Sequence, residues 1–154
     1  MSTELPLRVD RWRVLVVANE TLVGGVLHEW IGLRAEGGAD VLVVAPALNS
    51  RLAHWSSDER RARAAAAARL ARCLDALRAL DVDAEGRVGD ADPLLAIEDA
   101  LRTFAADEIV LATHPEGRSN WLARDLVGRA RARFRQPIHH VVVDAAGRHE
   151  LFAA

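Results

Sequence analysis

The stretch from Val88 to Trp121, VGDADPLLAIEDALRTFAADEIVLATHPEGRSNW, decides the fold of this chain. Within it, Asp92 followed by Pro93 is typical of a helix start, and apolar residues at helical spacing continue to Phe104. The run from Ile109 to Thr113 predicts a buried strand, and the glycine-containing loop after it predicts the start of another helix. Together these signals indicate a βαβ unit, and open α/β sheets bind their ligands where such strands end.

Other apolar runs predict further strands on both sides of this unit. Two of them, residues 13–18 and 41–45, are nearly continuous, which is typical of strands buried on both faces of a parallel sheet. Residues 138–143 are predicted as the fifth strand. Residues 82–88 instead alternate small or apolar side chains with charged ones, which predicts an exposed edge strand. After a turn, residues 148–152 are predicted to return as a short antiparallel strand.

The segments between the predicted strands have apolar residues at helical spacing. This spacing predicts helices over residues 22–36 and 57–80, and Ser119 or Asn120 is expected to cap a last helix that continues to about Arg135. Cys73 falls on the apolar stripe of the second helix, so we interpret it as a small core residue rather than a reactive thiol.

The order of these elements predicts the fold class. Five strands that alternate with four helices, joined by right-handed crossovers, make a single doubly wound, five-stranded parallel sheet of Rossmann-like type. The domain is expected to span residues 11–154, after a flexible lead of residues 1–10.

Composition disfavours several classes of function. The chain has 154 residues and a net charge of −2, so no global positive field favours nucleic acid or an anionic membrane. The Arg residues between 118 and 135 scatter around their predicted helix, which favours a solvated face over a nucleic-acid surface. No apolar run approaches the roughly 20 residues of a membrane span. With a single cysteine and no signal-peptide pattern, we expect a cytoplasmic protein.

The motifs resemble those of a known family. The Gly89-Asp90-Ala91-Asp92-Pro93 segment, the Ala-rich helix and the run from Ala105 to His114 are similar to the second half of a universal stress protein domain. The order of elements from Arg13 to Asp144 also fits that family, whose fold is related to the adenine nucleotide alpha hydrolases. The resemblance implies strand order 3-2-1-4-5. It also implies a family that includes both ATP binders and non-binders, often as dimers through the last strand.

The resemblance places a candidate nucleotide site at the carboxyl ends of the first and fourth strands. ATP-binding relatives carry an acidic residue after the first strand, where this chain has Asn19, and a Gly-x2-Gly-x9-Gly-Ser/Thr loop after the fourth. That loop is reduced here to Gly117-Arg118-Ser119-Asn120, followed by Trp121. Free backbone N–H groups at a helix start, together with the Arg118 guanidinium, would favour an anion. Val44 in the second strand completes the set of candidate nucleotide-binding or anion-binding residues. We expect at most weak binding of ATP or AMP.

The histidines do not form a recognisable metal-binding or catalytic motif. His139 and His140 are adjacent on a predicted strand, so their side chains are expected to point to opposite faces. No His-x3-His spacing, Walker loop or Gly-x-Ser-x-Gly elbow is present. We therefore assign no catalytic residue and no metal ligand.

Three hypotheses about function follow from the sequence. The first is a non-catalytic binding or regulatory domain, like a universal stress protein, with an altered nucleotide site. The second is a structural or interaction module that binds no nucleotide, and the third is a nucleotide-dependent enzyme of the same fold. Residues 138–143 are apolar and predicted at a sheet edge, so a homodimer through this strand is expected, unless the tail of the same chain covers it.

Overall fold

A computed structural model of the chain describes residues 11–18, 38–47, 56–113, 125–143 and 149–152. The predicted lead (residues 1–10) and the predicted helix over 22–36 lie outside the described residues. The described strands are β1 (Trp12–Ala18), β2 (Ala39–Pro46), β3 (Ala84–Gly89), β4 (Glu108–Thr113), β5 (Ile138–Val143) and β6 (His149–Phe152). The described helices are α2 (Ser56–Ala79), α3 (Pro93–Thr103) and α5 (Leu126–Arg133).

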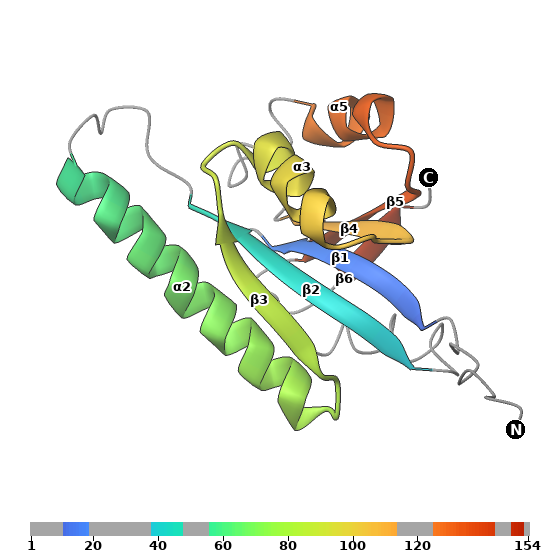
Figure 1. Ribbon diagram of the computed structural model, residues 1–154, viewed down its shortest axis with the longest axis horizontal. Coiled ribbons are helices and arrows are strands. Elements are labelled where there is room, and N and C mark those ends of the chain that lie inside the picture. Colours follow the sequence, from blue (N-terminus) through green and yellow to red (C-terminus); the bar gives the residue numbers. More distant parts are fainter. Residues whose placement is uncertain (1–10, 19–37, 48–55, 114–124, 144–148, 153–154) are drawn as a thin grey trace, which may run out of the picture.

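The described strands form one sheet in the order β3-β2-β1-β4-β5-β6 (Figure 1). The first five are parallel to one another, and β6 runs antiparallel to β5. This confirms the doubly wound parallel sheet with order 3-2-1-4-5 and the short antiparallel strand after it. The continuous apolar runs of β1, β2 and β4 occupy the centre, because a strand covered on both faces needs apolar side chains on both.

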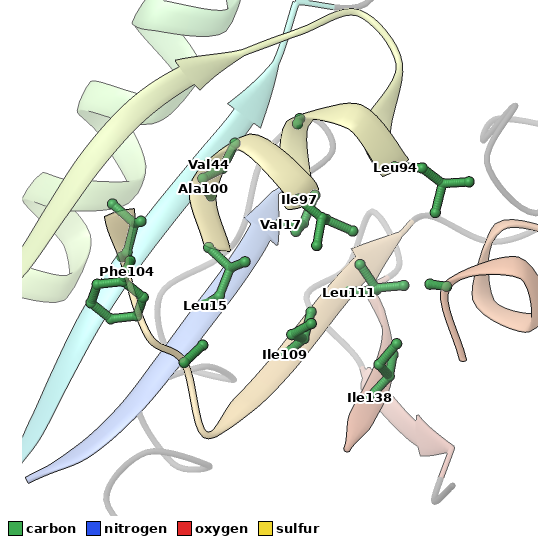
Figure 2. Close-up of a cluster of buried hydrophobic side chains, with 14 of the residues drawn as sticks. Leu15, Val17, Val44, Leu94, Ile97, Ala100, Phe104, Ile109, Leu111 and Ile138 are labelled. Atoms are coloured by element: carbon green, nitrogen blue, oxygen red, sulfur yellow. The ribbon is translucent and has the colours of Figure 1, made fainter. Parts of the chain in front are cut away.

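Two hydrophobic clusters lie on opposite faces of the sheet. Side chains alternate along each strand, so Val14 and Val16 of β1 point toward one cluster while Leu15 and Val17 point toward the other. The first cluster is covered by α2, through Leu70, Cys73 and Leu77. The second is covered by α3 and α5, and Figure 2 shows Ile97 and Ala100 of α3, with Phe104 directly after the helix, over it.

The buried position of Cys73 confirms its interpretation as a core residue. Its side chain is buried among the aliphatic residues of the α2 cluster. Burial raises the pKa of the Cys73 thiol to about 11, because the thiolate loses its hydration there. A protonated, enclosed thiol is a poor nucleophile.

The start of α3 follows the sequence prediction closely. Asp92 has extended backbone angles and its Oδ1 accepts a hydrogen bond of 3.0 Å from the backbone N–H of Leu94. Pro93 occupies the first turn, where its missing N–H is no loss. The helix therefore starts at the carboxyl end of β3 with its exposed donors already partly satisfied.

The last described helix differs from its prediction. A continuous helix from Ser119 or Asn120 to Arg135 is wrong, because Asp125 adopts a left-handed conformation (φ 50°, ψ 45°) and α5 begins at Leu126. Asp is among the residues that tolerate this conformation. Gly128 leaves room for the exposed Asp125 carboxylate, since a Cβ there would lie 2.7 Å from its Oδ2 atom. Residues 119–124 lie outside the described part of the chain.

The edge of β5 is covered within the same chain. Val141 of β5 pairs with Leu151 of β6, and Val143 pairs with His149. The sequence left open whether a second copy or the tail would cover this edge, and in the structure of the single chain the tail does so. A homodimer through residues 138–143 stays a prediction.

Candidate functional site

The candidate site lies where the central strands end. Val17 and Ala18 of β1 pair in parallel with Leu111 and Ala112 of β4, so both strands finish at the same edge of the sheet. This confirms the sequence prediction that the tips of the first and fourth strands come together. Segments that leave adjacent parallel strands at their carboxyl ends are the usual ligand-binding segments of this fold.

A buried polar pair lies at this edge. The Thr113 Oγ1 atom, at the end of β4, is 2.7 Å from the His140 Nε2 atom of β5, and both side chains are buried. The hydrogen bond satisfies two polar groups that would otherwise be costly to bury. The pair was not predicted from sequence, although the alternation of side chains along β4 and β5 placed both residues on the α5 face.

The surroundings of this pair favour an uncharged imidazole. Burial lowers the pKa of His140 below its ordinary value of 6.5, and the positive charge of Arg131 on α5 lowers it further. The Arg131 Nη2 atom donates to the Ile138 carbonyl at 3.3 Å, which holds the guanidinium beside β5. At neutral pH the imidazole can therefore accept a hydrogen bond from the Thr113 hydroxyl at Nε2, which an imidazolium could not do.

A cation from α2 lies at the carboxyl end of β2, on the other face of the sheet. The Arg69 Nη2 atom of α2 donates to the carbonyl of Pro46, the last residue of β2, at 3.1 Å. The next residue, Ala47, donates its backbone N–H to the Gly89 carbonyl at 3.1 Å, which holds the ends of β2 and β3 together. Arg69 was not among the site residues predicted from the sequence.

Most of the predicted site residues lie outside the described part of the chain: Asn19, Gly117, Arg118, Ser119, Asn120 and Trp121. Val44 is described, and its side chain is buried in the cluster under α3 (Figure 2). Its backbone lies within the sheet, between Val17 of β1 and Arg87 of β3.

The adjacent histidines of β5 lie on opposite faces, as predicted. While His140 contacts Thr113, the His139 Nε2 atom lies 3.3 Å from the Glu108 Oε2 atom of β4 on the α2 face. Among the described residues, no group of three or more His, Cys, Asp or Glu side chains is placed to hold a metal ion. None of the described helices is long and apolar enough to cross a membrane.

Comparisons with known proteins identify the fold. No protein-family model matches the sequence, and no curated protein matches it either. The structure is similar to that of a universal stress protein from Archaeoglobus fulgidus, with a TM-score of 0.57 and 18% sequence identity over 84% of this chain and 97% of that one. It is also similar to a universal stress protein family protein from Arabidopsis thaliana, solved with AMP bound. There the TM-score is 0.52 and the identity 15% over 88% of this chain and 94% of that one.

The chain is thus an α/β protein with a Rossmann-like parallel sheet. More particularly, it has the fold of the universal stress proteins. Both structural relatives are matched over nearly their whole length, so the likeness extends beyond the βαβ unit from which the resemblance was first inferred.

Proposed function

We propose that this protein is a non-catalytic binding and regulatory domain that takes an adenine nucleotide weakly at the carboxyl ends of β1 and β4. The observation that supports this most is the pairing of Ala18 with Ala112, because it brings the ends of the two strands together. The AMP bound in the Arabidopsis relative supports the class of ligand. We further propose a cytoplasmic protein with one domain over residues 11–154.

The binding residues in this proposal are those of the sequence prediction. Asn19 would contact the ribose or adenine, β2, which contains Val44, would border the base with its carboxyl end, and the Gly117–Trp121 segment would hold the phosphate. Arg118 would supply the charge that the shortened glycine loop lacks, since a guanidinium binds phosphate oxygens in a bidentate manner. The buried pair of Thr113 and His140 would support the segment that begins directly after β4.

The test is calorimetric titration of the full chain with AMP, ADP and ATP. We expect a dissociation constant of about 0.1–1 mM for the best of them, and an affinity about tenfold lower in Arg118→Gln. Arg102→Gln is the matched control, because Arg102 is an exposed arginine at the end of α3, paired with Asp99 at 3.5 Å. Micromolar binding that Arg118→Gln leaves unchanged would refute the site assignment.

Two other results would favour the alternatives. No saturable heat with any of the three nucleotides would favour an interaction module that binds no nucleotide. Hydrolysis of ATP above background, abolished by a substitution at Asn19 or Arg118, would favour an enzyme of the same fold.

We propose that a homodimer forms through β5 only when β6 has left that strand. Because β6 occupies the hydrogen-bonding edge of β5, a second copy could pair there after β6 leaves.

A further inference from the structure

A cavity of about 320 Å³ lies at the opposite edge of the sheet from the candidate nucleotide site. It lies where β1, β2 and β3 begin, beside the last turn of α3, and is lined by Arg13, Asp40, Val41, Asp83, Ala84, Glu85, Arg87, Thr103 and Phe104. We call it the Arg13 pocket. Its volume is at the lower end of the range for small-molecule sites, and most of its side chains are charged.

The sheet register brings these charges to one face. Arg13 pairs with Asp40 across β1 and β2, while Glu85 and Arg87 of β3 pair with Leu42 and Val44. Leu42 and Val44 belong to the cluster under α3, so their β3 partners also point toward the α3 side. The charged side chains therefore lie on the same face of the sheet as the apolar cluster under α3.

The two cations converge on the end of α3. The Arg13 guanidinium carbon lies 4.5 Å from the centroid of the Phe104 ring, and Arg87 donates to the Thr103 hydroxyl. Within the described ranges, the half-buried Arg13 guanidinium has no hydrogen-bond acceptor, and its Nε is a buried donor without a partner. A guanidinium held by stacking on an aromatic ring retains its strong capacity to bind a carboxylate.

The carboxylates of the pocket come from the starts of β2 and β3. Asp40 is already paired with Arg11, whose Nε atom lies 2.9 Å from Oδ1. Asp83 lies just before β3 and Glu85 lies on it. Neither forms an ion pair with any residue that the structure describes. Besides the Arg11–Asp40 pair, the lining of the pocket therefore holds two guanidinium groups, Arg13 and Arg87, and two carboxylates, Asp83 and Glu85.

We propose that the Arg13 pocket binds a small zwitterion of the amino-acid or dipeptide type. Its carboxylate would contact Arg13 and Arg87, and its ammonium group would contact Asp83 and Glu85. A nucleotide or other polyanion would be repelled by the two carboxylates, and a simple cation by the two guanidinium groups. This site is separate from the proposed nucleotide site and does not depend on it.

Titration of the isotope-labelled full chain with glycylglycine, followed by amide chemical shifts, tests the proposal. We expect saturable shifts at amides lining the pocket, with a midpoint in the range of about 1–10 mM. N-acetyl-glycylglycine lacks the ammonium group and glycylglycinamide lacks the carboxylate. Each is expected to bind at least about tenfold more weakly, since each loses one charged contact.

Substitutions locate the site. Arg13→Gln and Glu85→Gln should each weaken glycylglycine binding at least about fivefold, and Arg102→Gln, outside the pocket, should leave it unchanged. If Arg13→Gln fails to fold, as its amide spectrum would reveal, Arg87→Gln takes its place, because Arg87 is exposed. Shifts that stay linear with concentration, equal binding of the three compounds, or unchanged binding in the Gln variants would overturn the proposal.

Discussion

His140 shows how the environment of one residue decides its chemistry. Two adjacent histidines follow each other on β5, yet one faces Glu108 on the α2 side and the other contacts Thr113 under α5. The alternation of a strand predicted the opposite faces. The partners could not be predicted, because they depend on the register between β4 and β5, which the sequence of either strand alone does not determine.

The lowered pKa of His140 makes the stability of the fold depend on pH. A histidine whose folded-state pKa lies below 6.5 binds a proton more readily in the unfolded chain, so its contribution to stability is complete above pH 6.5. The free energy of unfolding should fall as the pH drops from 6.5 through the lowered pKa, by up to about 1.4 kcal/mol per pH unit. Urea unfolding at several pH values between 7 and 5 measures this fall in the free energy of unfolding.

His140→Gln provides the control for this prediction. A glutamine can keep a hydrogen bond to Thr113 but does not titrate, so the pH dependence of the variant between 7 and 5 should be smaller than that of the parent chain. Equal slopes for the two chains would show that other groups cause the pH dependence and that His140 contributes nothing.

The packing between elements depends on two glycines of β3. A Cβ at Gly89 would lie 2.8 Å from both Ala96 Cβ and Val44 Cγ1, which belong to short, stiff side chains. A Cβ at Gly86 would lie 2.7 Å from the Cδ1 atoms of Leu70 and Leu74, which are the ends of flexible side chains. The first contact is therefore harder to relieve than the second.

We expect Gly89→Ala to destabilise the protein by about 1–3 kcal/mol, because it overpacks the contact between β3, β2 and α3. Gly86→Ala, the matched substitution in the same strand, should change the stability by less than about 1 kcal/mol, since the two leucines can rotate and alanine suits a strand better than glycine. Thermal and urea unfolding of the two variants would measure the difference. The prediction fails if Gly86→Ala is the more damaging change.

The elements differ in how well sequence reasoning predicted them. The start of α3 was predicted correctly because Asp92 and Pro93 act locally, through one side chain and one fixed φ angle. The start of α5 was predicted wrongly. Apolar periodicity cannot reveal a single left-handed residue such as Asp125.

At the scale of the whole molecule, the strand order was implied by a family resemblance, while the strands themselves came from hydrophobic pattern alone. β1, β2 and β4 are apolar on both faces because helices cover both, and that requirement is visible in the sequence. The candidate site could be predicted only as an edge of the sheet. The Arg13 pocket was missed, because its charges come together through the register of three strands rather than through any local motif.

The two edges of the sheet are protected in different ways, and this leads to a prediction for the oligomeric state. β3 carries charged side chains, whereas the apolar β5 is covered by β6. A chain that ends at Asp144 would expose the β5 edge, so it should self-associate more strongly than the full chain, and sedimentation velocity at matched concentrations measures this. Replacing Val142 by lysine in the shortened chain should reduce the association, since a charge on an exposed edge strand opposes pairing. A full chain that is already dimeric, and that becomes monomeric when shortened, would show instead that β6 forms the interface.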